Sequence, residues 1–299
     1  MEWLLRRLPQ SWTLPGATTA DGSQRRPRTL RAIRRGWFFP LLLALLLVFG
    51  LGLPFVIRTD PNRVQMTQRL QPPSAEHWFG TDHLGRDLLA RVIHGGRTTL
   101  SFGLGAVALT MLMALGIGMV AGYYGGRVDL WLNSLIDLIL TLPTLLITLA
   151  LLGILGVSGP TLIIALVGTA WAAPARILRA ATLSIRSSGY VEAARAIGVP
   201  QPQILRRHIA PNIATPLLML ASLELADVLL VISALSFLGL GAQPPNADWG
   251  VMIAEGRTYI GQAPWLMWAP GLCIVFYAAL ANLAGDGLKQ VLDQSFQRT

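Results

Sequence analysis

The chain has 299 residues, of which 53% are hydrophobic and only 13% are charged. That balance excludes an ordinary water-soluble globular protein, in which about a quarter of the residues carry a charge. The formal net charge of +9 comes from arginines that stand between apolar segments and form no stripe with interleaved aromatic residues, which argues against a nucleic-acid-binding protein and for basic loops at a membrane.

The amino-terminal segment, residues 1–36, carries eight arginines and is rich in Pro, Gly, Ser and Thr. Such a composition is typical of a segment without a packed core, so we expect a basic cytoplasmic tail. The apolar segment that follows, 37–57, is too long for the core of a signal peptide and lacks a clear small-residue cleavage site. It therefore predicts an uncleaved membrane anchor helix, followed by an external loop over 58–97.

Six segments are apolar enough to cross a bilayer, which takes about 20 residues of helix. We place them at 37–57, 98–123, 130–155, 161–178, 212–238 and 266–288. The uncharged stretch 138–175 is too long for one span, and the turn-forming residues 156–160 divide it into a helical hairpin. The sequence thus predicts an all-α, polytopic membrane protein with six transmembrane helices, a five-helix core over 98–290 and a cytoplasmic carboxy-terminal tail over 291–299.

Arginine and lysine are unevenly divided between the two sides of the membrane. With the amino terminus inside, the cytoplasmic segments hold 17 of them and the external segments seven. Because basic residues accumulate in cytoplasmic loops, we expect both termini to lie in the cytoplasm.

The cytoplasmic loop 188–211 is longer than a turn and carries the most specific pattern in the chain. A short helix begins near Tyr190, has Glu192 in its first turn, where a carboxylate favours the helix dipole, and stops at Gly198. A proline-containing elbow follows, and a second short helix over 203–209 is expected to end at Pro211. The small side chains of Ala193, Ala194 and Ala196 leave this loop open to close approach by a partner.

The run Glu192-Ala193-Ala194, with Gly198 and Pro211 after it, resembles the Glu-Ala-Ala loop of binding-protein-dependent ABC importer permeases. In that family the loop docks into a groove on the ATPase subunit and transmits its closure to the membrane helices. His208 and Ala210 depart from the broad consensus of Ile and Leu, but a His-Ile-x-Pro-Asn ending is similar to the peptide-importer branch. Ile209 keeps the apolar residue of the family pattern, and Pro211 keeps the proline that is expected to break the helix.

The external loop carries a second resemblance, over residues 77–87. This segment is similar to the one that precedes the second span in C-type permeases of dipeptide, oligopeptide and nickel importers. The positions that carry the likeness are Gly80, Thr81, Asp82, Gly85, Arg86 and Asp87. Further matches lie at 237–241, 244–245, 248–250 and 282–286, so the resemblance covers roughly residues 76–293.

The resemblance implies the type I ABC importer permease fold and a multi-pass subunit of the bacterial inner membrane that translocates di-/oligopeptides. It also implies the partners: a second permease, two ATPase subunits and an extracytoplasmic substrate-binding protein. The chain has no Gly-x-x-x-x-Gly-Lys-Ser/Thr phosphate loop, so we expect no ATPase activity of its own, and ATP and Mg to bind the partner ATPase subunits. Two alternatives stay open, a nickel or metal-chelate ABC permease and, from another class, a stand-alone secondary transporter.

Two acidic residues, Glu224 and Asp227, stand three apart near the middle of the fifth span, hence on one helix face. A carboxylate at that depth is costly, so it should face water or a partner group. They either line the translocation path and attract an ammonium group or cation, or they form a buried hydrogen bond to another helix or the partner permease. Asp137, followed by Pro143, marks either a kink that shapes a gate or a structural polar contact.

The remaining polar residues point to no catalytic or metal site. His77, His83 and His94 lie near Asp82 and Asp87, but their spacing fits no compact ligand set, which favours a solvated or receptor-facing loop. His208 has neither a paired carboxylate nor a nucleophile beside it. Cys273, the single cysteine, lies inside the last span and is expected to serve packing.

Overall fold

The computed structural model describes residues 29–56, 59–243 and 245–296, which are helical apart from loops and one isolated bridge between Thr81 and Asp87. Two short 3-10 helices are η3 (Met66–Gln68) and η5 (Arg257–Tyr259), and η4 (Leu205–Ile209) is a π-helical turn. The α-helices are α1 (Thr29–Val56), α2 (Leu88–Tyr124), α3 (Gly126–Thr141), α4 (Thr144–Leu155), α5 (Gly159–Ala170), α6 (Ala172–Arg186), α7 (Gly189–Ala196), α8 (Gln201–Ile204), α9 (Ala210–Phe237), α10 (Trp249–Gly256) and α11 (Trp265–Phe296). The all-α prediction is confirmed.

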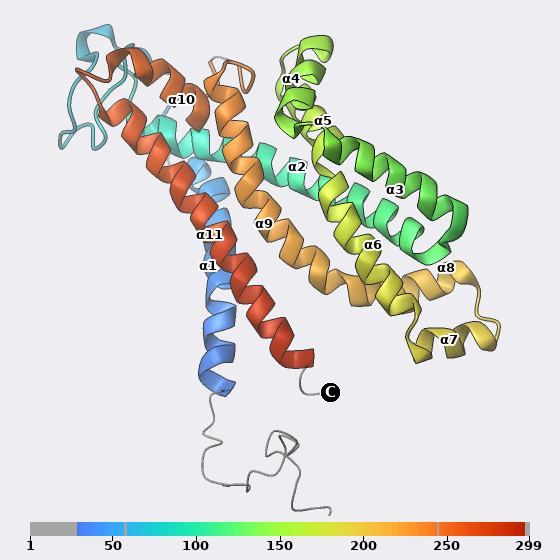
Figure 1. The fold of residues 1–299 in the computed structure, drawn as a ribbon. Helices are drawn as coiled ribbons and strands as arrows, with labels where there is room; N and C mark the ends of the chain where they lie inside the picture. Colours follow the sequence, from blue (N-terminus) through green and yellow to red (C-terminus); the bar gives the residue numbers. More distant parts are fainter. Residues whose placement is uncertain (1–28, 57–58, 244, 297–299) are drawn as a thin grey trace, which may run out of the picture.

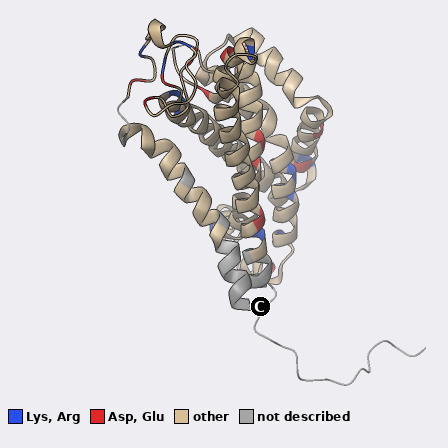
Figure 2. Ribbon diagram, turned by 90° about the vertical axis from the view of Figure 1, so that its left-hand side faces the viewer, with Lys and Arg blue, Asp and Glu red and all other residues tan. Residues whose placement is uncertain are grey.

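Among the described residues, three helices are long and apolar enough to cross a membrane: α2, the continuous rod from α8 to α9, and α11. The bent pairs α3–α4 and α5–α6 raise that number to five if each pair is one span, and α1 contains a shorter apolar stretch, Pro40–Phe55. Most of the helical ribbon in Figure 2 carries no charged residue, whereas basic and acidic residues recur in the loops at one end of the bundle. By these helix bounds, each of the six predicted spans overlaps a helix or a bent helix pair.

Several helices extend beyond the predicted spans. Helix α2 begins at Leu88, inside the segment predicted as external loop, because Asp87 caps its first turn by accepting from the Ala90 N–H at 2.8 Å. Helices α1 and α11 also run into the predicted tails, from Thr29 and as far as Phe296. The first 28 residues of the predicted amino-terminal tail lie outside the described residues.

The predicted kink at Pro143 is a bend of 90° between α3 and α4. Proline cannot donate a backbone hydrogen bond and its ring clashes with the preceding turn, so α3 ends at Thr141 and the chain turns at Leu142 and Pro143. The segment predicted as one span, 130–155, thus consists of two short helices. The predicted turn near residue 156 is confirmed, with Ser158 as the amino-terminal cap of α5.

Helix α9 lies centrally and packs against α2, α6, α10 and α11, while α1 packs along α11 (Figure 1). Helices α2 and α6 approach closely because Gly122 faces α6, where an added Cβ would lie 2.6 Å from the Thr182 Cβ. One apolar core joins α2, α9, α10 and α11, and a second joins α2 and α6 to α7, η4 and the start of α9. In Figure 1 the helices α7 and α8 lie at the end of the bundle remote from α10 and the loop that precedes α2.

Candidate functional site

The predicted helix stop at Gly198 is a complete Schellman motif at the end of α7. Gly198 has φ of +78° and donates to the Arg195 carbonyl at 3.0 Å, and Val199 donates to the Ala194 carbonyl at 3.1 Å. An added Cβ at Gly198 meets no atom of this chain within 4 Å. Glycine is needed here for its left-handed conformation and not for lack of space.

Helix α7 has two different faces. Val191 and Ala194 are buried in the second apolar core, whereas Glu192 and Ala193 are exposed. Ile197, directly after the helix, is 82% exposed, which is unusual for a large apolar side chain beside a rigid cap. The prediction that Ala194 lies open to a partner was wrong, because its small side chain serves packing within this chain.

Polar contacts join α7 to two membrane helices. Asn212 of α9 donates to the Tyr190 hydroxyl at 3.2 Å and to the His208 carbonyl at 2.7 Å. The Arg195 guanidinium lies 5.6 Å from the ring centroid of Tyr123, near the end of α2. A displacement of α7 is therefore felt by both α2 and α9.

The second short helix of the loop continues into the membrane without a break. Helix α8 runs through the π-turn η4 into α9, and Pro211 lies in the first turn of α9. The rod continues past the proline through this π-turn, in which the Ala210 N–H donates to the Leu205 carbonyl, so the predicted break at Pro211 was wrong. Ile204 and Ile209 are fully buried and fix this rod to the second core.

Glu224 and Asp227 lie about one turn apart on α9. Glu224 is half-buried and Asp227 is exposed. Neither carboxylate makes a hydrogen bond or ion pair within the part of the chain that the structure describes. The alternative of a hydrogen bond to another helix of this chain is therefore not observed. Asp137, in contrast, pairs with Arg176 of α6 and accepts from Asn133 at 2.9 Å, which favours its structural interpretation.

The external motif builds a compact base for the loop before α2. Gly80 and Gly85 have φ of +77° and +72°, and an added Cβ would lie 2.5 Å from the Gln71 carbonyl oxygen and 1.8 Å from that of Gln65, respectively. Thr81 is fully buried, and its hydroxyl accepts from the Gln71 N–H at 2.8 Å. Asp87 caps α2, and its second carboxylate oxygen lies 2.8 Å from the His77 Nδ1.

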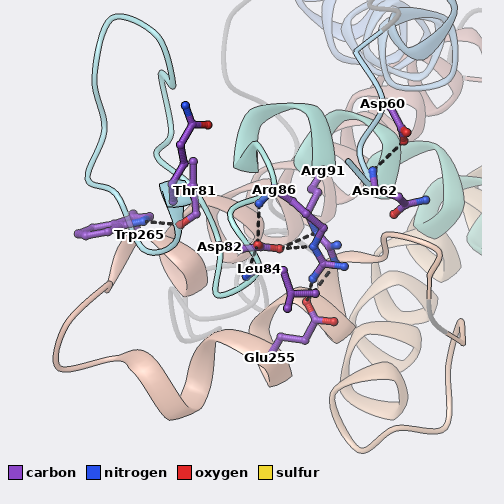
Figure 3. Close-up of polar contacts among 10 residues, drawn as sticks. Asp60, Asn62, Thr81, Asp82, Leu84, Arg86, Arg91, Glu255 and Trp265 are labelled. Atoms are coloured by element: carbon purple, nitrogen blue, oxygen red, sulfur yellow. Dashed lines mark hydrogen bonds and ion pairs between the residues drawn. The ribbon is translucent and has the colours of Figure 1, made fainter. Parts of the chain in front are cut away.

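Four charged side chains form a buried ion network behind this motif (Figure 3). Asp82 lies 2.6 Å from the Arg86 Nε and 3.6 Å from the Arg91 Nε. Glu255 of α10 receives both guanidinium groups, at 3.1 Å from Arg86 and 3.0 Å from Arg91. The network fastens the external loop and the start of α2 to α10. Sequence reasoning missed Glu255, which stands far from the motif along the chain.

The histidines of the external loop have separate surroundings. His77 contacts Asp87, whereas the ring of His83 stacks on Tyr259 with centroids 5.6 Å apart. Asp82, His83 and Glu255 do place one ligand atom each within 4.8 Å of one another. Two guanidinium groups already bind those carboxylates, however, which disfavours a further cation there.

Asp248 supplies a second buried fastening between α10 and α2. Its carboxylate accepts from the Thr99 hydroxyl at 2.8 Å and from the backbone of Gly250 at 2.9 Å. Complete burial raises the pKa of Asp248, and these hydrogen bonds oppose that rise. Trp249 adds a hydrogen bond of 2.9 Å to the Val92 carbonyl.

Residues 114–298, more than half of the chain, match the family described as the binding-protein-dependent transport system inner membrane component. The chain belongs to this family. The permease is 37% identical over 287 residues to a putative peptide transport system permease protein of Brucella suis biovar 1, covering 95% of this chain and 96% of that protein. It is also 37% identical to the probable D,D-dipeptide transport system permease protein of Escherichia coli K12, with 85% and 84% covered. The nickel transport system permease protein of the same strain is 36% identical, with 85% and 91% covered.

Among solved structures, an inward-facing MetNI methionine ABC transporter matches the permease with a TM-score of 0.55 and 20% identity. The match covers 67% of this chain and 94% of that one, and it supports the fold alone. The predicted family and the type I ABC importer permease fold are confirmed. The permease is thus a multi-pass membrane component and not the ATPase subunit of its transport system.

Proposed function

We propose that the permease translocates di- or oligopeptides across the bacterial inner membrane, driven by ATP hydrolysis in partner subunits. The proposed assembly contains a second permease, two ATPase subunits that bind ATP and Mg, and a soluble external substrate-binding protein. Both termini face the cytoplasm, as the distribution of arginines favours.

The observation that carries this proposal is the two-faced construction of α7. Its outer side presents Glu192, Ala193 and Ile197 to a partner, while Val191 and Ala194 are locked into a core shared with α2, α6 and α9. A push on the outer face by a closing ATPase dimer is transmitted as a rigid-body movement, because a packed core does not deform continuously.

The movement has a direct route to the middle of the membrane. Helix α8, η4 and α9 are one continuous rod, and Glu224 and Asp227 stand on it without partners in the described part of this chain. We infer that these carboxylates line the translocation path and attract the ammonium end of a peptide. Rocking of α9 then exposes them alternately to the two sides of the membrane.

Exchange of Glu224 for Gln together with Asp227 for Asn is expected to slow uptake of peptides with a free amino terminus more than uptake of their N-acetylated forms. The physical reason is the loss of two negative charges that attract the ammonium group. Initial uptake rates in proteoliposomes measure the effect, and Asp286→Asn, an exposed carboxylate on α11, is the matched control. Equal slowing of both peptide forms would contradict the assignment.

The substrate class is tested by isothermal titration of the binding protein encoded beside this gene. The peptide relatives favour tight binding of short peptides. Binding of a nickel chelate alone would instead support the second candidate, which the nickel relative keeps open. The alternative of a stand-alone secondary transporter is disfavoured by family membership.

A further inference from the structure

The external segment 72–79 projects from a firmly closed base. At that base Gln71 and Thr81 are joined by two hydrogen bonds, of 2.8 and 3.0 Å. Within the segment, Ser74 donates to the His77 carbonyl at 2.8 Å and accepts from the His77 N–H at 3.1 Å. The ion network of Arg91 and Glu255 lies beside this base and supports it (Figure 3).

This rigid segment exposes two aromatic side chains. Trp78 is 72% exposed and its neighbour Phe79 is 38% exposed. Exposed aromatic residues on a fixed support are typical of protein contacts, in which tryptophan contributes strongly to affinity. Because the segment is already ordered, little conformational entropy is lost when a partner binds.

Trp78 forms one wall of a groove of about 410 Å³ whose other walls are mostly charged. The charged and titratable residues that line it are Asp60, Arg63, Glu76, His77 and Asp87. Asp87 is paired with His77, whereas Asp60 and Glu76 make no ion pair among the described residues. Three carboxylates against one guanidinium make the groove acidic, on a chain whose formal net charge is +9.

We propose that this groove docks a basic surface loop of the soluble binding protein, with a lysine or arginine between Trp78 and Glu76. The inference rests on the proposed function, which supplies the external partner. A cationic side chain suits both walls, because it is attracted by carboxylates and by the face of an indole ring. The same carboxylates repel anionic lipid headgroups, so a membrane surface fits the groove less well.

The experiment measures the affinity of the binding protein for the complete transporter in nanodiscs, at low and at high salt. Glu76→Lys is expected to weaken binding about tenfold at low salt, and the difference is expected to shrink at high salt because screening weakens exposed charge pairs. Trp78→Ala is expected to weaken binding at both salt concentrations. Both side chains are exposed, so the variants should fold. Asn246→Lys places a lysine at another exposed position of the external side, a charge change of +1 against +2 for Glu76→Lys, and serves as the control.

Unchanged affinity for both variants would overturn the groove assignment while leaving the proposed function intact, provided that the wild-type transporter binds its binding protein. Equal weakening by Asn246→Lys and Glu76→Lys would also overturn it, because the effect would then report net charge and not the groove. A wild-type transporter that binds no such protein would remove the proposed function together with this inference.

Discussion

Gly198→Val is expected to reduce ATP-driven uptake to the level measured without ATP, while the amount of permease in the membrane stays unchanged. A left-handed conformation costs a side-chain-bearing residue about 1–2 kcal/mol, so the Schellman motif at the end of α7 opens. The exposed Ile197 beside it is then displaced from the surface that we assign to the ATPase. An added Cβ meets no atom of this chain within 4 Å, so we expect insertion and packing to be spared.

Gly189→Val is the matched control for this substitution. Gly189 is exposed in the first turn of the same helix, has no positive φ and also has nothing within 4 Å of an added Cβ. Uptake should persist in that variant. Normal transport by Gly198→Val would count heavily against α7 as the element that couples the ATPase to the membrane helices.

Arg91→Met is expected to lower the free energy of unfolding. Breaking a buried ion pair costs about 3–5 kcal/mol, and we expect a value near the lower end of that range. The Arg91 side chain is 1% exposed, and its removal leaves Asp82 and Glu255 with a single guanidinium between them. The lower part of the range applies because Glu255 remains 26% exposed. A lower thermal unfolding temperature and fragmentation of the external loop by protease would report the loss.

Arg63→Met is the comparison for this second substitution, since Arg63 is exposed and makes no ion pair in the described part of the chain. Surface changes of that kind usually alter stability by less than about 0.5 kcal/mol. Equal unfolding temperatures for the two variants would contradict a structural role of the network.

Composition and local pattern were enough to predict the helical spans and the coupling loop. Each of the six apolar segments lies on a helix or a bent helix pair, Pro143 predicted the bend between α3 and α4, and Gly198 predicted the end of α7. Each of these signals acts through residues that are near one another in the sequence. Local physical chemistry therefore decides them before tertiary packing contributes.

The errors arose where tertiary contacts override local preference. Gly95 and Gly96 were predicted to lie in a loop. They lie within α2, where Trp249 packs against them. Pro211 was predicted to break the helix but lies within the continuous rod of α8, η4 and α9, just after a π-helical turn. Glu255 completes the ion network of Arg86 and Arg91 from 164 positions beyond Arg91, a pairing that one sequence cannot disclose.

The central claim is tested most directly by peptide uptake into proteoliposomes that contain both permeases, the two ATPase subunits and the binding protein. The account predicts uptake that requires ATP, the binding protein and the intact end of α7 at Gly198. Peptide uptake by the isolated chain in ATP-free vesicles would contradict it, as would ATP hydrolysis by the full assembly that moves no peptide.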